Sequence, residues 1–439
     1  MSASNHPSKK DNPIPEVTHL IEHLVERENM IRAYEKVKRN KGAAGHDGME
    51  VSSLKEHLDK HWSSLKESLL GSRYYPEGVL QVEILKPNGG IRKLGIPTVV
   101  DRLIQQSLHQ VLSPIFEPYF SPHSYGFREG KSAEDAIKSS QFFIQQGYDW
   151  VVDMDLEKFF DEVPHDVLMG KIRKRVKDKA VLRLIRRYLE ADVMVKGKRE
   201  RRTKGVPQGG PLSPLLSNIL LDDLDKELEK RGHRFCRYAD DCNIYVRSER
   251  AGQRVKESLT EYLRKRLKLK VNEAKSAVDR PWKRVFLGFT FLVDKHRRIT
   301  VAKKSILRLK GKVKELFRKG KGRNLGKFIE EDLNPLLRGW INYFRPVQTK
   351  RFAEDLDGWI RRHLRKIIWR QWKRNWTRFQ GLMRQGLPEE RAARSAFNRR
   401  GPWFNSGASH MNQAFPKTYF TKLNLVSVQD QLNYWKAKT

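Results

Sequence analysis

Residues 235–246, Phe-Cys-Arg-Tyr-Ala-Asp-Asp-Cys-Asn-Ile-Tyr-Val, place two adjacent aspartates between two short segments of β-forming residues. This pattern predicts a β-hairpin that carries Asp240 and Asp241 at its tip. Aspartate is also a common turn residue, so the pair alone has a plain structural explanation. Two like charges at one tip nevertheless need compensation, which a bound Mg²⁺ ion would provide together with water and substrate phosphates.

A second acidic segment lies upstream, in the stretch 150–156, Trp-Val-Val-Asp-Met-Asp-Leu. Strand alternation places Asp153 and Asp155 on one face and the apolar side chains between them on the other. If this strand lies beside the hairpin, Asp155 joins Asp240 and Asp241 in the acidic cluster of a two-metal phosphoryl-transfer site, with ions about 3.5–4 Å apart. Such ions activate an attacking 3′ hydroxyl and stabilise leaving pyrophosphate.

The charge of the chain indicates a polyanionic partner. Its 439 residues are enough for two or more domains, and they carry a formal net charge of +36. A hydrophobic content of 38%, with 10 Trp and 20 Phe, argues for a folded protein over a disordered basic tail. Residues 301–439 hold 32 Lys or Arg against 10 Asp or Glu, so this stretch contributes +22 of the total.

Cys236 and Cys242 are the two cysteines, and both flank the hairpin tip. Two cysteines exclude a Cys₄ zinc site and do not suggest a disulfide framework, so reduced and buried thiols are expected. The sequence shows no apolar run of transmembrane length and no signal peptide, which predicts a soluble, cytoplasmic protein without a membrane partner.

Basic and aromatic residues suited to a nucleotide precede and follow the acidic segments. Residues 81–97 predict a second β-hairpin with Lys86 and Arg92 near its tip, a suitable site for a triphosphate; an exposed charged turn is the alternative. Phe160 follows Asp155 by five residues, and its ring either excludes a ribose 2′-OH or belongs to the core. Gln208 lies in a loop containing Gly and Pro, at 205–214, that leads into a helix and could contact a base pair.

The other expected elements are mostly helical. Trp369, Trp372 and Trp376 share one face by helical spacing, and we expect these rings in the core, with Lys and Arg outside on phosphates; stacking on bases is the alternative. Helical patterns also cover residues 17–40, 101–117, 215–230, 251–267 and a helix containing 336–344, whereas 286–291 predicts a strand with a close backbone approach at Gly288.

Taken in order, these segments resemble the reverse transcriptases encoded by group II introns, also called maturases, and most closely the compact bacterial class C type without an endonuclease domain. The similarity covers roughly residues 28–439. It rests on Lys41–Gly48, Lys86–Pro97, Ser124–Arg128, Asp155–Asp161, Gly205–Pro214, Tyr238–Asp241, Lys275, Phe286–Phe289 and Gly339–Phe344.

The resemblance implies an α/β (α+β) right-hand polymerase, with an antiparallel sheet in the fingers and palm. A helical thumb and a basic, mainly helical DNA-binding domain would follow. The expected boundaries are a flexible leader at 1–27, an N-terminal extension with the start of the fingers at 28–80, catalytic fingers and palm at 81–300, the maturase thumb at 301–350 and the DNA-binding domain at 351–439.

The resemblance also assigns roles to individual residues. Two Mg²⁺ ions, for which Mn²⁺ would substitute, are assigned to Asp155 and Asp240 with Asp241 in support; Asp153 is the competitor of Asp155 on the same strand face. The remaining assignments are Lys275 as proton donor to pyrophosphate, Lys86 and Arg92 on the triphosphate, Phe160 as sugar gate, Gln208 beside the incoming nucleotide, and Phe286, Leu287, Gly288 and Phe289 as primer grip.

The implied function is RNA-directed DNA synthesis combined with maturase activity. The protein would bind a structured group II intron RNA, assist its splicing and copy it by target-primed reverse transcription during retrohoming. Its partners would be an RNA template with a DNA primer, target DNA and dNTPs, and a monomer is favoured. The alternatives are a domesticated relative used in DNA repair or defence, and a non-catalytic RNA-binding splicing factor.

Overall fold

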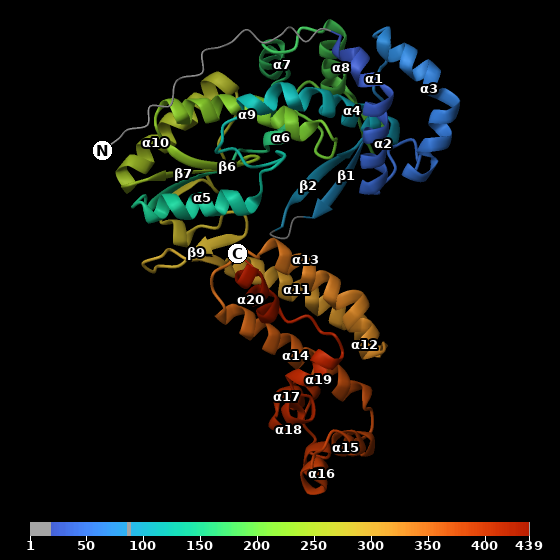
Figure 1. The fold of residues 1–439 in the computed structure, drawn as a ribbon, viewed down its shortest axis with the longest axis vertical. Coiled ribbons are helices and arrows are strands. Elements are labelled where there is room, and N and C mark those ends of the chain that lie inside the picture. Colours follow the sequence, from blue (N-terminus) through green and yellow to red (C-terminus); the bar gives the residue numbers. More distant parts are fainter. Residues whose placement is uncertain (1–18, 86–88, 439) are drawn as a thin grey trace. The chain divides into compact units, whose positions relative to one another are not determined.

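The computed structural model describes residues 19–85 and 89–438, so Lys86 lies outside the described residues (Figure 1). The chain divides into two compact units, one ending at Arg280 and the other beginning at Pro281. No helix among the described residues is long and apolar enough to cross a membrane.

An antiparallel sheet of four strands forms the centre of the first unit, in the order β6-β7-β3-β8. The predicted hairpin is confirmed, because β6 and β7 pair across the tip formed by Ala239 and Asp240. The bounds are β3 Trp150–Met154, β6 Arg234–Tyr238, β7 Asp241–Val246 and β8 Ala277–Asp279, so Asp155 comes directly after β3.

A second sheet of four strands has the order β2-β1-β4-β5. Its first two strands form the predicted antiparallel hairpin, in which Ile84 pairs with Arg92, and β1 continues into a parallel pairing with β4. The bounds are β1 Val79–Leu85, β2 Ile91–Ile96, β4 Val193–Val195 and β5 Lys198–Glu200.

The helices of this unit pack with its strands around one large apolar core. They are α1 Leu20–Val25, α2 Arg27–Asn40, α3 Leu54–Leu70, α4 Val99–Phe116, α5 Ala133–Gln145, α6 Phe159–Glu162, α7 His165–Arg173, α8 Lys179–Glu190, α9 Ser213–Lys230 and α10 Glu249–Tyr262. The helix expected over 251–267 therefore ends as an α-helix at Tyr262 and continues as a π-helical turn over Leu263–Leu267.

Helices α5 and α10 cover opposite faces of the central sheet (Figure 1). Gly252 of α10 approaches Val152 so closely that a Cβ on it would lie 3.6 Å from a Val152 methyl group. Phe143 of α5 contacts Tyr245, with ring centroids 5.7 Å apart, and Tyr245 pairs with Val151. Because Val151 and Val152 are neighbours on one strand, they point to opposite faces.

The second unit is mainly helical and has its own apolar core, which extends from Leu309 to Leu432. This core draws on both the stretch expected as thumb and the stretch expected as DNA-binding domain. The elements are β9 Phe289–Phe291, β10 Ile299–Val301, α11 Lys303–Lys319, α12 Leu325–Phe328, α13 Asn334–Tyr343, α14 Arg351–Gln371, α15 Asn375–Arg384, α16 Glu389–Ala396, α17 Pro402–Gly407, α18 Ser409–Ala414, α19 Lys417–Lys422 and α20 Val428–Lys438.

Two expectations about the N-terminal region are corrected by the structure. The helix expected over 17–40 is divided into α1 and α2, because Glu26 adopts an extended ψ of 140°. The leader expected over 1–27 is wrong for Leu20–Val25, since α1 buries its apolar side chains. Residues 1–18 lie outside the described residues.

Two expectations in the second unit are also corrected. The strand expected over 286–291 begins only at Phe289, because Leu287 and Gly288 have φ of 51° and 83° and form a tight turn between Phe286 and Phe289. The expected close approach at Gly288 is confirmed, with a Cβ there 3.0 Å from Ser305 Oγ. Trp376 lies on α15 and is 60% exposed, because α14 ends at Gln371, so it does not share a core face with the buried Trp369.

Candidate active site

The hairpin tip is held in a strained conformation by a close backbone contact. Ala239 has a φ of 58°, in the left-handed region that residues with a Cβ rarely adopt. Gly126 lies directly against it, and a Cβ on Gly126 would be 2.3 Å from the Ala239 nitrogen. Only glycine therefore allows the segment 124–128 to support the tip from outside the hairpin.

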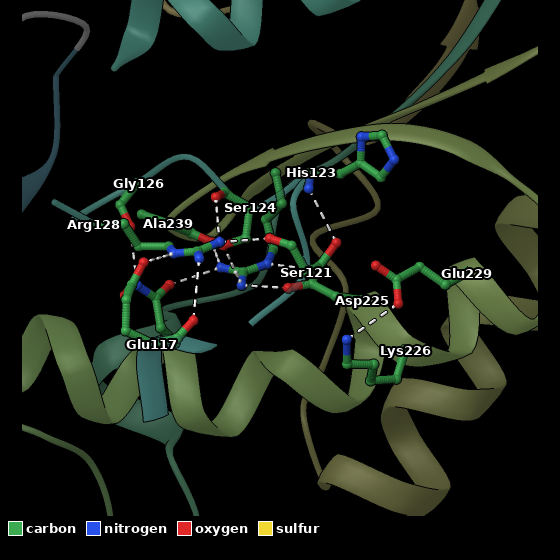
Figure 2. A network of polar contacts seen from close by, with 12 residues as sticks. Glu117, Ser121, His123, Ser124, Gly126, Arg128, Asp225, Lys226, Glu229 and Ala239 are labelled. Carbon is green, nitrogen blue, oxygen red and sulfur yellow. Dashed lines mark hydrogen bonds and ion pairs between the residues drawn. The ribbon is translucent and has the colours of Figure 1, made fainter. Parts of the chain in front are cut away.

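The Arg237 guanidinium, which is fully buried, connects the tip to two other parts of the chain. Its Nε and Nη2 donate to the two carboxylate oxygens of Asp225 on α9, at 2.7 and 2.5 Å. Its Nη1 donates to the Ala239 carbonyl at 2.9 Å and to Asn218 Oδ1 at 3.0 Å, and its Nη2 donates to Ser124 Oγ at 2.8 Å. Three of these partners, Ser124, Asp225 and Ala239, are labelled in Figure 2.

The ion pair is maintained by mutual attraction against the effect of burial. Burial alone would lower the pKa of Arg237, but the Asp225 carboxylate outweighs it and the net pKa is raised. Burial raises the pKa of Asp225, and the charge of Arg237 opposes that rise. The bidentate geometry is the arrangement in which such a pair retains its charges in a low-dielectric interior.

The loop that contains Gly126 is fastened to the same strand. The Tyr125 amide donates to the Arg237 carbonyl at 2.8 Å, and the Arg237 amide donates to the His123 carbonyl at 2.9 Å. Asn218 Nδ2 donates to the Gly126 carbonyl at 2.9 Å. Arg128 pairs with Glu117 at 2.7 Å, as Figure 2 also shows, so this arginine stabilises the loop.

Asp155 is positioned from the opposite direction by residues 272–276. Its amide donates to Ser276 Oγ at 3.0 Å, and its carbonyl accepts from the Asn272 amide at 2.8 Å. Lys275 Nζ lies 3.2 and 3.3 Å from the two carboxylate oxygens of Asp155. The structure thus brings Asp155 and Lys275 together, as their assignment to one site requires.

The aspartates of the two acidic segments lie within electrostatic reach of each other. Burial and then the charge of Asp155 raise the pKa of Asp240, which Arg92 and Lys275 partly oppose. Asp241 is exposed as a residue, yet its carboxyl group is largely surrounded by protein. Desolvation and then Asp240, Asp153 and Asp155 raise its pKa to about 7. Four carboxylates therefore converge beside two cations, and both Asp153 and Asp155 belong to the cluster.

This cluster fits a divalent cation by its charge and its oxygen donors. Oxygen ligands are those that Mg²⁺ and similar hard cations prefer, and a raised carboxyl pKa shows that the charges lack full compensation. Within residues 19–85 and 89–438, no three His, Cys, Asp or Glu side chains are already arranged to hold one ion. The carboxylates would have to move together around it, with substrate oxygens completing the shell.

Two further expected site residues are joined by the loop at 205–210. The Val206 amide donates to the Phe160 carbonyl at 2.6 Å, and the Gly95 amide donates to the Gln208 carbonyl at 2.8 Å. Gly209, with a φ of 133°, lies so close to Gly95 that a Cβ would be 2.5 Å from its carbonyl oxygen. This loop therefore connects the segment of Phe160 with strand β2, on which Arg92 lies.

Phe160 is half-buried and meets the buried Phe159 edge to face, at 5.2 Å between ring centroids, so part of its ring is accessible. The expected primer-grip residues, Phe286–Phe289, belong to the second unit, where Phe289 packs against Phe344 at 4.9 Å. Cys236 and Cys242 are free and buried, as expected.

Sequence reasoning missed the residues that hold the hairpin tip in place, above all Asp225, Arg237 and Gly126. A signal for one of them was present: an arginine at 237, between the buried Cys236 and the aromatic Tyr238 of a strand, predicts a buried charge that needs a partner. Nothing local in the sequence identifies Asp225 as that partner.

Comparison with known protein families gives two matches. Residues 84–291 match the model described as reverse transcriptase (RNA-dependent DNA polymerase). Residues 306–386 match the model described as group II intron, maturase-specific domain.

Three individual proteins are also similar to this chain. Protein YkfC of Escherichia coli is 30% identical over 293 residues, which cover 58% of this chain and 76% of that protein. The group II intron-encoded protein LtrA of Lactococcus lactis is 33% identical over 210 residues, covering 48% of this chain but only 35% of LtrA. Among solved structures, a partial Cas6-RT-Cas1–Cas2 complex matches 55% of this chain and 41% of that chain, with 27% identity and a TM-score of 0.37.

The buried ion pair leads to a prediction about stability. Asp225→Asn should lower the free energy of unfolding by about 3–5 kcal/mol, because it leaves the Arg237 guanidinium buried without its counter-charge. Asp223→Asn on the same helix is the matched control; Asp223 pairs with Lys171 at a partly exposed position, so about 1 kcal/mol or less should be lost. Urea denaturation measures both, and equal losses would contradict the role given to the buried pair.

The raised pKa of Asp241 leads to a prediction about pH. With a folded pKa of about 7 and a lower unfolded value, this group stabilises the fold at low pH, and that stabilisation disappears as pH rises through about 7. In chelator, Asp241→Asn should therefore raise the melting temperature more at about pH 8 than at about pH 5. Thermal unfolding at the two pH values tests this, with exposed Asp59→Asn of α3 as control; an equal gain at both would refute it.

Proposed function

The chain belongs to the group II intron family of reverse transcriptases, with an RNA-dependent DNA polymerase domain followed by a maturase-specific domain, and we propose that it copies a group II intron RNA into DNA and assists its splicing. The observation that carries the proposal is the convergence of Asp153, Asp155, Asp240 and Asp241 from two separate segments of the chain. A purely RNA-binding protein has no need for such a cluster of like charges.

In this proposal the acidic cluster holds the divalent metal ions of polymerisation. Asp155 and Asp240 are the primary ligands, and Asp241 supports them. When bound, two Mg²⁺ ions, or Mn²⁺ in their place, would supply charge stabilisation at the attacking 3′ hydroxyl and the leaving pyrophosphate. The chain's own contribution is to hold the carboxylates through Arg237 and through the contacts of residues 272–276.

The other residues orient the substrate and move a proton. Arg92 lies within electrostatic reach of Asp240, and together with Lys86 it would bind the triphosphate of the incoming dNTP. Lys275, now paired with Asp155, would release that carboxylate and protonate the departing pyrophosphate. Phe160 and Gln208, joined by the loop at 205–210, would lie at the sugar and the base of the same nucleotide.

The second unit would hold nucleic acid. We assign residues 301–350 to the maturase thumb, 351–439 to the DNA-binding domain and Phe286–Phe289 to the primer grip. The net charge of +22 over residues 301–439 supports binding of intron RNA, the template–primer duplex and target DNA. A monomer acting in the cytoplasm is the proposed form.

The first test is primer extension with Asp240→Asn. On an RNA template with an annealed DNA primer, dNTPs and Mg²⁺, the variant should lose about 10²–10³-fold or more of the wild-type rate, because a preorganised charge at the reaction centre is removed. RNA binding, measured by filter retention, should be unchanged. Exposed Asp59→Asn should extend like the wild type. Failure of the wild-type protein with every template and metal would favour the RNA-binding factor.

The second test concerns Phe160 and sugar selectivity. Phe160→Val should increase ribonucleotide incorporation relative to deoxyribonucleotide incorporation by about 10–200-fold, since opening the pocket removes the steric exclusion of the 2′-OH. Single-nucleotide kcat/KM values measure the ratio. Phe159→Leu is the neighbouring control, which should reduce stability without changing selectivity because Phe159 is buried. If the ratio of ribonucleotide to deoxyribonucleotide kcat/KM is unchanged in the Phe160 variant, Phe160 is a core residue and not the sugar gate.

A further inference from the structure

A cavity of about 560 Å³ lies between helices α11 and α14 of the second unit. The two helices, both visible in Figure 1, meet through Phe317 of α11 and His363 of α14, whose rings stack at 4.9 Å with an interplanar angle of 3°. We call this cavity the α11–α14 groove. It is lined by Gly311, Lys314, Glu315, Phe317, Arg318, Lys321, His363, Lys366, Ile367 and Arg370.

Five cations face the groove, against the single acid Glu315. Within residues 19–85 and 89–438, none of these five is in an ion pair, whereas Arg323 nearby in the sequence pairs with both Glu331 and Asp332. Burial and then Arg370 and Lys321 lower the pKa of Lys366. Cations from both helices therefore converge on one space without internal compensation, which favours an anionic ligand.

The cations are arranged in two rows that follow the helices. Lys314 and Arg318 are four residues apart on α11, and Lys321 continues the row; Lys366 and Arg370 are four residues apart on α14. A spacing of four residues advances by about 6 Å along a helix. A repeated positive charge at this interval suits a ligand with a repeated negative charge, such as a phosphodiester backbone, better than a single anion.

The size of the α11–α14 groove favours one strand over two. Its volume of about 560 Å³ is in the range of small-ligand pockets, about 300–1,000 Å³. A space of this size accommodates a short piece of a single strand, and a double helix would remain outside it.

Aromatic rings lie beside the cations. Burial and then the charges of Lys366, Lys314 and Arg362 lower the pKa of His363 to about 4, so its ring is neutral at physiological pH. Trp403, 41% exposed, lies 4.9 Å from the His363 ring and beneath Lys366 at 5.4 Å. An accessible ring next to phosphate-binding cations is the combination found in proteins that bind unpaired strands.

We propose that the α11–α14 groove binds the backbone of an unpaired nucleic-acid strand, through Lys314, Arg318, Lys321, Lys366 and Arg370. The inference deepens the proposed function and rests on it for its biological role, because it names the form of nucleic acid that one part of the maturase-specific domain recognises. Single-stranded RNA and single-stranded DNA share the required chemistry. A duplex does not enter a pocket of this size, and an acidic peptide has no bases to stack on the exposed Trp403 ring.

The test uses the full chain and fluorescence anisotropy without dNTPs. Lys314→Gln/Lys366→Gln should weaken binding of a single-stranded oligonucleotide on the order of tenfold and reduce the slope of log affinity against log salt by about 1.4, or about 0.7 for each phosphate that is no longer neutralised. Arg318→Gln/Lys321→Gln is an independent second pair with the same expected result. The matched control is Lys312→Gln/Lys373→Gln, which removes two exposed cations of the same region outside the groove.

Four probes separate the outcomes: single-stranded RNA, single-stranded DNA of the same sequence, the RNA duplex and polyglutamate. A selective loss on either single strand upholds the proposal and identifies the sugar. The proposal is overturned if the groove variants lose as much affinity for the duplex as for the single strands, or no more affinity than the control variant loses. It is also overturned if they lose affinity for polyglutamate alone. Primer extension on a preannealed template measures the polymerase separately. If the groove variants bind single strands like the wild type and the protein still extends primers, the groove proposal is wrong and the proposed polymerase function is unaffected.

Discussion

The placement of the catalytic hairpin depends on the buried ion pair between Arg237 and Asp225. Removal of two charges from water is unfavourable by several kcal/mol per ion, and only close geometry with every donor satisfied compensates for it. Here the guanidinium makes five hydrogen bonds to groups on α9, on the loop before α5 and at the hairpin tip. One side chain thereby fixes the carbonyl of Ala239, and with it the position of Asp240.

This rigid support allows the tip to hold two unfavourable features. Ala239 has a left-handed φ, and burial together with the neighbouring carboxylates raises the pKa of Asp241 to about 7. Either feature alone would favour rearrangement of an isolated two-stranded hairpin, which is only marginally stable in water. Gly126 packs against the Ala239 backbone, and Arg237 donates a hydrogen bond to the Ala239 carbonyl. The repelling carboxylates thus lie on a backbone that several separate contacts hold in place.

The parts of the fold that local patterns encode were predictable, and those that depend on distant contacts were not. Alternation in 81–97 and 150–156, together with the β-forming residues in 235–246, predicted strands β1, β2, β3, β6 and β7, since period 2 is a property of the backbone itself. No periodic pattern marks the break at Glu26 or the end of α14 at Gln371. The single helix expected over 17–40 is therefore two helices in the structure, and Trp376 does not lie on the face predicted for it. The same holds for the candidate site. Its three predicted aspartates can be recognised by residue type, whereas the pairing of Arg237 with Asp225 can be recognised only in the three-dimensional structure.

The basic residues around the hairpin and those of the α11–α14 groove act in opposite ways, which net charge cannot reveal. In the first unit Arg237 and Arg128 are buried, each pairs with an acid, and each orders the backbone around the hairpin. In the second unit the five cations of the α11–α14 groove line one space with the single acid Glu315, and none of them forms an ion pair within the part of the chain that the structure describes. A paired arginine stabilises the fold at any salt concentration, because burial limits screening, whereas an unpaired row of cations gains free energy only when a polyanion arrives and counterions leave. If the α11–α14 groove binds a strand as proposed, binding would relieve the repulsion among its cations, and the affinity would depend steeply on salt.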